Sequence, residues 1–79
     1  MHDQIGYVLG NARRKQILEM LDKRGVMRLA AVSHLIHMAP MMTERILNEL
    51  QERKLLERKD DTYRLTEEGK GVLKKITAI

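Results

Sequence analysis

The sequence predicts a mainly α-helical fold with a small β-hairpin before the last helix. Three observations predict this class. Apolar residues recur at helical spacing along most of the chain, most clearly over 40–53. Two short alternating segments, 55–58 and 62–65, flank a polar turn and predict the hairpin. With 79 residues, the chain is expected to form one domain, 1–79, around a thin core.

The composition predicts an aliphatic core and excludes several classes of site. The sequence has two Tyr, no Phe and no Trp, while apolar residues make up 43% and charged residues 33% of it. It has no Cys, which excludes disulfides and thiolate metal sites. No apolar run approaches the ~18 residues that a membrane span needs, and no signal-peptide pattern occurs. We therefore expect a cytoplasmic protein without a membrane partner.

The first quarter of the chain predicts a short segment with half of a helical apolar stripe, here called the half-stripe, and then a complete helix. Gly10 and Asn11 interrupt the half-stripe, and Asn11 is a good N-cap because its side chain can accept a free backbone N–H. A helix over 12–23 is expected to follow, and Gly25 is suited to end it. The inward residues are predicted to be Ile5, Val8 and Leu9 in the half-stripe, and Ile17, Leu18 and Leu21 in the helix.

The middle of the chain predicts two helices joined by a tight turn. A very short strand at 26–27 is expected to precede a helix over 28–36, and residues 37–39 form the turn. Pro40 suits a first helical position, where its missing N–H is not needed. A three-residue connection makes the two helices cross steeply. The predicted inward residues are Leu29, Val32, Leu35 and Ile36, followed by Thr43, Ile46, Leu47 and Leu50.

The last third predicts a hairpin that leans on a final helix. Residues 59–61 form the expected turn, since Asp tolerates the backbone angles of a tight hairpin. Thr66 is a good N-cap for a helix with Val72, Leu73, Ile76 and Ile79 on its apolar side. Gly69 and Gly71 should each weaken this helix by about 1 kcal/mol. Helix, tight turn, helix and hairpin is the element order of a winged helix-turn-helix.

Three passages within residues 8–76 carry a family resemblance: GNARRKQILEML, LAAVSHLIHMAPMMTERILNELQERKLL and RKDDTYRLTEEGKGVLKKI. In these passages the sequence resembles the small archaeal winged helix-turn-helix transcriptional regulators. The resemblance implies a homodimer that binds double-stranded DNA, with a recognition helix (about 40–53) in the major groove and a wing (about 55–65) on the backbone. The residues it implies at the DNA are Met41, Met42, Glu44, Arg45, Asn48, Glu49, Arg58, Lys59 and Arg64. Lys54 stands where the family commonly has a glycine.

The residue types on the exposed face of 40–53 leave two interpretations open. Arg can grip guanine and Asn can grip adenine with two hydrogen bonds each, so Arg45 and Asn48 suit base contacts. Alternatively, Arg45 pairs with Glu49 one turn away as a surface ion pair. Three basic residues near the start of the 12–23 helix, and one at the start of the expected 28–36 helix, suit flanking phosphates: Arg13, Arg14, Lys15 and Arg28.

A second function class, a winged-helix module that binds a protein partner rather than DNA, also fits the sequence. The recognition helix is acidic, with Glu44, Glu49 and Glu52, and it exposes Met41 and Met42, which suit an adaptable protein contact. The net charge of +4, from 15 Lys and Arg against 11 Asp and Glu, is compatible with either partner. A dimer contact is expected from apolar residues near the chain ends, namely Ile5, Val8, Leu9, Leu73, Ile76 and Ile79.

The sequence predicts no catalytic site and no bound cofactor. Ser33 is the only Ser and lies among helix core residues, and no glycine-rich phosphate loop occurs. His34 and His37 are three residues apart and could share a metal with His2. No Cys or well-placed carboxylate completes a tetrahedral site, so we expect no metal.

Overall fold

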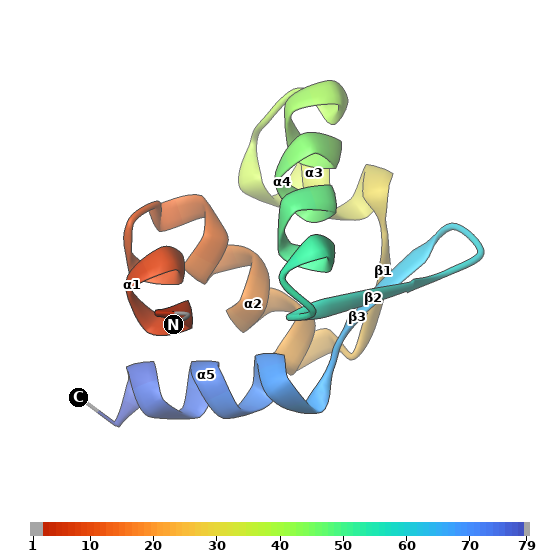
Figure 1. Ribbon diagram of the computed structural model, residues 1–79. Coiled ribbons are helices and arrows are strands. Elements are labelled where there is room, and N and C mark those ends of the chain that lie inside the picture. The colour runs from red at the N-terminus through yellow and green to blue at the C-terminus, as the bar shows by residue number, and fades with distance from the viewer. Residues whose placement is uncertain (1–2, 79) are drawn as a thin grey trace.

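The computed structural model describes residues 3–78 and has a helical body from which a β-hairpin projects (Figure 1). Its elements, in chain order, are α1 (Gln4–Leu9), α2 (Ala12–Arg24), β1 (Val26–Arg28), α3 (Leu29–Ile36), α4 (Pro40–Glu52), β2 (Leu56–Lys59), β3 (Thr62–Leu65) and α5 (Glu67–Thr77). Among the predicted residues, His2 and Ile79 lie outside the described range. This order confirms the predicted fold class, a mainly α winged helix-turn-helix.

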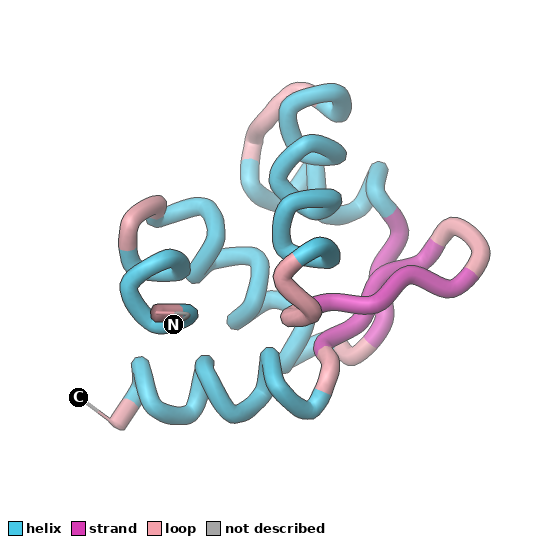
Figure 2. Tube along the Cα trace, in the orientation of Figure 1, coloured by secondary structure: helices cyan, strands magenta, loops and turns pink. Residues whose placement is uncertain are grey.

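The sheet has three antiparallel strands in the order β1-β3-β2, so the short segment before α3 completes the wing (Figure 2). In β1, Met27 lies opposite Tyr63, and in β2 Glu57 lies opposite Arg64. A two-stranded hairpin alone is barely stable in water. The third strand, together with burial of Met27 and Tyr63, fixes the hairpin to the helical body.

The predicted helix starts and stops are confirmed where a side chain or a glycine makes the cap. The Asn11 side chain accepts from the backbone N–H of Arg13, at the start of α2. Gly25 ends α2 with a φ of 88°, and the Thr66 side chain accepts from the N–H of Gly69 at the start of α5. Each cap satisfies a backbone group that the helix itself leaves open. These local rules explain why the observed bounds lie within one or two residues of the predicted ones.

One aliphatic core joins all five described helices and the sheet, as the composition predicts. All four inward residues predicted for α4 are buried. In α3, Val32 and Ile36 are buried, but Leu29 and Leu35 are only partly buried at its edge. The helix-turn-helix angle therefore depends mainly on the buried faces of α3 and α4. The core comprises Val8, Ile17, Leu18, Leu21, Met27, Val32, Ile36, Ile46, Leu47, Leu50, Leu55, Leu56, Tyr63, Leu65, Val72, Leu73 and Ile76.

Helix α4 ends in a Schellman turn, in which Lys54 takes the left-handed conformation. The N–H of Leu55 donates to the carbonyl of Leu50 at 3.0 Å, and the N–H of Lys54 donates to the carbonyl of Gln51 at 2.9 Å. Lys54 has a φ of 64°, a value that glycine reaches at the lowest cost. Lys54 thus adopts the conformation that glycine commonly takes at the end of a helix.

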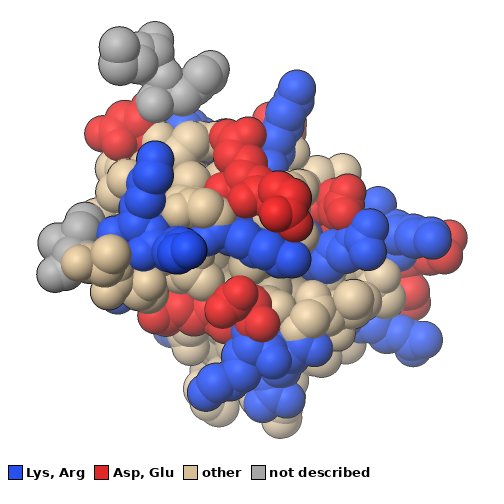
Figure 3. Space-filling view, turned by 90° about the horizontal axis from the view of Figure 1, so that it is seen from below, with Lys and Arg blue, Asp and Glu red and all other residues tan. Residues whose placement is uncertain are grey.

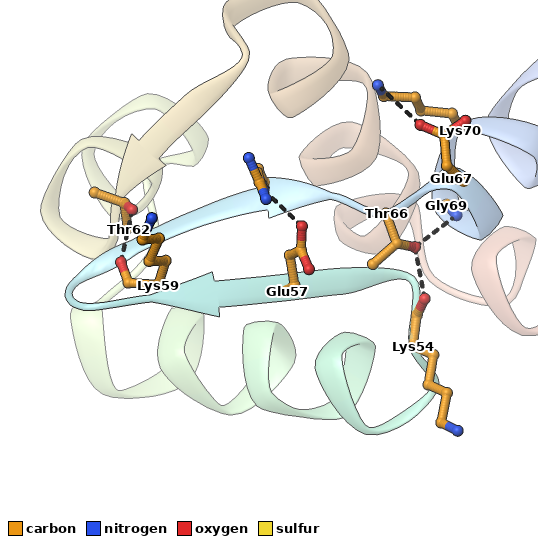
Figure 4. Close-up of polar contacts among 9 residues, drawn as sticks. Lys54, Glu57, Lys59, Thr62, Thr66, Glu67, Gly69 and Lys70 are labelled. Atoms are coloured by element: carbon orange, nitrogen blue, oxygen red, sulfur yellow. Dashed lines mark hydrogen bonds and ion pairs between the residues drawn. The ribbon is translucent and has the colours of Figure 1, made fainter.

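Gly69 has a packing role that its helix propensity conceals. A Cβ at this position would overlap with the carbonyl oxygen of Leu55. The Thr66 hydroxyl holds the same junction by donating to the Lys54 carbonyl at 2.6 Å (Figure 4). Gly69 therefore lets α5 approach the start of the wing. A Cβ at Gly71 would meet no atom within 4 Å, so Gly71 only lowers helix propensity.

The apolar residues expected to form a dimer contact are largely used by the core. Val8, Leu73 and Ile76 have exposed fractions of 0%, 5% and 7%, because α1 and α5 pack against α2 within the same chain. Ile5 is partly buried, and Leu9 alone among the described residues of this set stays 50% exposed. The expected surplus of apolar surface at the chain ends was therefore wrong.

Candidate nucleic-acid interface

Helix α4 carries a row of exposed side chains along the face opposite its buried one. With 3.6 residues per turn, Met41, Arg45, Asn48 and Glu52 fall along the centre of this face. Met42 and Glu49 lie on one flank and Glu44 lies on the other. All seven are exposed except Glu49, which is partly buried. The structure thus brings six of the nine predicted site residues onto one helix.

Arg45 and Asn48 are both exposed and one turn apart, the arrangement that base contacts need. The ion pairs described for residues 3–78 join Arg28 to Asp61, Arg64 to Glu57 and Lys70 to Glu67. Arg45 is in none of them, so the alternative pairing with Glu49 is not found. Both residues are exposed, and no hydrogen bond of either side chain is described within residues 3–78.

The first turn of α4 is open to a ligand. Pro40 occupies the first helical position, and the N-cap residue Ala39 supplies no side-chain hydrogen bond. The Thr43 side chain, which could have served as a phosphate donor, is buried and donates to the Ala39 carbonyl at 3.0 Å. A helix start whose N–H groups lack a side-chain acceptor favours negative charge nearby, because the helix dipole is positive at that end.

In the wing, two of the three predicted basic residues are held by neighbouring groups. Arg64 Nε lies 2.6 Å from Glu57 Oε1, its cross-strand partner. Arg58 Nε donates to the Asp60 carbonyl at 2.8 Å. Lys59 is exposed beside the turn, and its backbone carbonyl accepts from the Thr62 hydroxyl at 2.8 Å (Figure 4). Lys59 is thus the predicted wing residue whose charged group has no contact described within residues 3–78.

The wing tip is also tied to β1, which sequence reasoning missed. Arg28 Nε lies 3.6 Å from Asp61 Oδ2, and both side chains are more than half exposed. The pairing of β1 with β3, in which Arg28 lies opposite Thr62, brings the arginine to the turn. Only this third strand, which pairs across more than 30 residues of sequence, could have revealed the contact.

The basic residues of α2 differ from one another in their surroundings. Arg13 donates to Gln16 at 3.0 Å from the first turn. Arg14 lies over the Tyr7 ring, 3.8 Å from its centroid, and donates to the Tyr7 carbonyl at 2.6 Å. Arg53, directly after α4, stacks on the other face of the same ring at 3.6 Å. Arg14 therefore connects helices of the body, and its predicted contact with flanking phosphate is not supported.

Seen from the side of α5, Lys and Arg side chains form a band with acidic groups on both sides (Figure 3). This face is thus mixed in sign. Within residues 3–78, no group of three His, Cys, Asp or Glu side chains is arranged to hold a metal ion. No helix of the described chain is long and apolar enough to cross a membrane.

Comparison with solved structures reveals the same fold in three proteins. YusO from Bacillus subtilis has a TM-score of 0.80 at 19% identity, covering 84% of this chain and 52% of YusO. RV1404 from Mycobacterium tuberculosis has a TM-score of 0.83 at 24% identity, and the match covers 94% of this chain and 56% of RV1404. The AntR antimony-specific transcriptional repressor has a TM-score of 0.79 at 23% identity, and the match covers 94% of this chain and 68% of AntR. The chain thus spans about half the length of the first two proteins, and at these identities the likeness concerns the fold.

Comparison with family models identifies the family of the chain, whereas the solved structures identify only its fold. A search of curated protein sequences finds no match. Residues 2–79 match the model described as the HVO_A0261 N-terminal domain, which is almost the whole chain. The predicted winged-helix character is therefore confirmed, while the archaeal origin implied by the resemblance stays a prediction. The chain belongs to the HVO_A0261 N-terminal domain family and has a winged helix-turn-helix fold.

Proposed function

We propose that residues 1–79 form a DNA-binding domain of a transcriptional regulator, with α4 as the recognition helix. The observation that carries this proposal is the central row of α4, where Arg45 and Asn48 are exposed with no ion pair within the described chain. The AntR structure, whose protein is a transcriptional repressor, has the same fold and supports the choice of partner.

In this proposal the start of α4 enters the major groove. Arg45 donates two hydrogen bonds to a guanine, and Asn48 pairs with the edge of an adenine. The other predicted contact residues of the helix line the groove beside them: Met41, Met42, Glu44 and Glu49. In a helix-turn-helix it is the N-terminal part of the second helix that reaches the bases. Glu52, in the last turn of α4, then lies farther from the bases.

The wing is proposed to touch the DNA backbone through Lys59, Arg58 and Arg64. Phosphate contacts supply affinity without sequence information, and they make binding depend on salt. A homodimer would place two α4 helices about one helical turn of DNA apart, on a palindromic site. Footprints of two half-sites with centres ~10 base pairs apart are expected, and a single protected half-site would contradict the dimer.

The test compares two single-arginine variants on duplex DNA. Arg45→Ala is expected to lower specific affinity by about 1–3 kcal/mol, since it removes a base contact. The matched control is Arg24→Ala, because Arg24 is also exposed but lies at the end of α2. It has the same charge change and is expected to stay near wild type. Equal affinity of Arg45→Ala and wild type, measured by anisotropy on a selected site, would remove Arg45 from the interface.

A protein-binding module remains the second candidate, because Met41 and Met42 are the exposed large apolar residues of α4. Salt separates the two functions. DNA affinity should fall steeply between 50 and 200 mM salt as phosphate contacts are lost. An apolar contact centred on methionines would change little over this range. Failure to bind duplex DNA at the lower salt concentration would favour the protein partner.

A further inference from the structure

Met41 is the most exposed large apolar residue among those described in the chain, with an exposed fraction of 81%. It lies in the first turn of α4, at the head of the central row that continues with Arg45 and Asn48. Nothing in the fold needs an apolar side chain there, because the buried face of α4 is complete with Thr43, Ile46, Leu47 and Leu50. The core therefore gains nothing from the Met41 side chain, which is available for contact with a ligand.

We propose that Met41 reads the C5-methyl group of a thymine in the major groove, a specificity contact that rests on the proposed DNA-binding function. The thymine methyl is the one apolar group that a base pair presents in this groove, and apolar side chains recognise it by contact. Methionine suits this role because its flexible, polarizable thioether adapts to a small apolar target. The ligand class is therefore thymine-containing duplex DNA.

The geometry of α4 restricts where that thymine lies. Met41 and Arg45 are four residues apart, which corresponds to ~6 Å along the helix axis. Successive base pairs are ~3.4 Å apart, so a helix lying along the groove covers about two base pairs over this distance. The thymine read by Met41 should therefore lie within about two base pairs of the guanine read by Arg45.

The charges around Met41 favour a nucleic acid over an apolar protein groove. The first turn of α4 holds no acidic residue, and the N-cap supplies no side-chain acceptor, so the helix dipole makes this end positive. Glu52, on the same row, lies eleven residues on, ~16 Å along the axis. Of the three carboxylates on the exposed side of the helix, Glu49 and Glu52 lie towards the other end, and Glu44 lies on the flank one turn from Met41. Met41 itself thus lies at the end of α4 where the helix dipole attracts phosphate-rich ligands.

The experiment removes single methyl groups from the DNA rather than from the protein alone. A binding site is first selected from random duplexes with the full chain. Each thymine of the selected site is then replaced by deoxyuridine, which lacks only the C5-methyl. Wild type, Met41→Ala and Met41→Leu are titrated on every duplex by fluorescence anisotropy. Met41 is exposed, so both variants should keep the fold, and circular dichroism checks this.

One thymine per half-site should respond. Its replacement is expected to lower wild-type affinity about three- to fourfold, the effect of one buried methyl group. Met41→Leu should show the same loss, because it keeps an apolar side chain, whereas Met41→Ala should bind both duplexes equally. Arg45→Ala should weaken binding overall but keep the discrimination between thymine and deoxyuridine, and the base it no longer distinguishes should lie within about two pairs.

Two results would overturn the inference while leaving the proposed function intact. In the first, Met41→Ala retains the wild-type loss at the same thymine, so another residue reads the methyl group. In the second, no replacement changes affinity although Arg45→Ala weakens binding, which would leave Met41 for a protein partner. If selection enriches no sequence and binding is absent at low salt, the proposed function itself fails, and this inference fails with it.

Discussion

At the scale of single residues, three left-handed positions fix where the elements around the proposed interface point. His37, Lys54 and Asp60 have φ values of 56°, 64° and 58°. His37 ends α3 before the turn to α4, Lys54 ends α4, and Asp60 lies at the wing tip. Asp visits this conformation at modest cost, whereas Lys has no side-chain group that compensates locally. Lys54 is therefore the position at which backbone strain is most easily relieved.

Replacing Lys54 by glycine should stabilise the protein. A left-handed residue with a Cβ destabilises the folded state by about 1–2 kcal/mol, which glycine avoids. Glycine also gives the unfolded chain more conformational freedom, which offsets about 0.5–1 kcal/mol of this gain. Lys54→Gly should therefore raise the free energy of unfolding by about 0.5–1 kcal/mol in urea titrations. Lys54→Ala retains the Cβ and serves as control. If both variants gained equally, loss of the lysine side chain rather than backbone relief would be the cause.

Residue-level rules could predict the caps but not the close approach at Gly69. Asn11, Gly25 and Thr66 act on neighbours within a few positions, so their roles are legible in the sequence. Gly69 is needed because of the carbonyl of Leu55, fourteen positions earlier. A propensity scale can only count such a glycine as a weak point of its helix. Contacts between elements, which no local rule encodes, reverse that interpretation.

At the scale of elements, the wing neutralises much of its own positive charge. The strand register sets Glu57 directly opposite Arg64, and the hairpin turn brings Asp61 to Arg28. These exposed ion pairs contribute little to stability. They do keep two guanidinium groups close to carboxylates, where phosphates must compete for them. The alternating pattern of the sequence could predict the hairpin. The ion pairs could not be predicted in this way, because they depend on the register and the partner of each strand, which periodicity does not supply.

Releasing Arg64 should therefore strengthen the dependence of DNA affinity on salt. Glu57→Gln is expected to raise affinity at low salt and to make the slope of log K against log salt steeper by about 0.9, the value for one added phosphate contact. The matched control is Glu67→Gln, which removes the same charge from the pair with Lys70 on α5 (Figure 4). An equal change in both variants, measured by anisotropy from 50 to 200 mM salt, would attribute the effect to net charge alone.

At the scale of the whole molecule, a polar and aromatic junction ties the start of the chain to the end of α4. The Gln4 amide donates to the Arg53 carbonyl at 2.9 Å and to Glu68 at 2.8 Å, so α1 holds both α4 and α5. The Tyr7 ring lies between the guanidinium groups of Arg14 and Arg53. Helix α4 is ~20 Å long in a molecule of 30 × 23 × 21 Å. Its position is thus set from both ends, by the turn after α3 and by this junction.

The sequence could predict the apolar stripes of α1 and α5 but not what would cover them. Helical spacing alone predicts an apolar stripe that contains Val8 and another that contains Leu73 and Ile76, but it does not show whether the core of the same chain or a second copy covers them. In the structure all three residues belong to the core. In the folded chain these stripes face α2 and each other, because a small domain needs most of its apolar residues to build a core. The Tyr7 junction was equally hidden, since its partners come from positions 14 and 53.

The junction predicts a graded response to changes at Tyr7. Tyr7→Leu removes both stacked contacts and should lower the free energy of unfolding by at least about 1–2 kcal/mol, because each cation–π pair contributes ~0.5–1 kcal/mol even at an exposed site and these groups are partly buried. Tyr7→Phe keeps the ring, and no hydrogen bond of the Tyr7 hydroxyl is described within residues 3–78, so it should stay within about 0.5 kcal/mol of wild type. Urea titrations measure both. Equal stability of Tyr7→Leu and wild type would mean that α1 is held by its other contacts, those of Gln4 and Val8, and that the end of α4 is positioned without the ring.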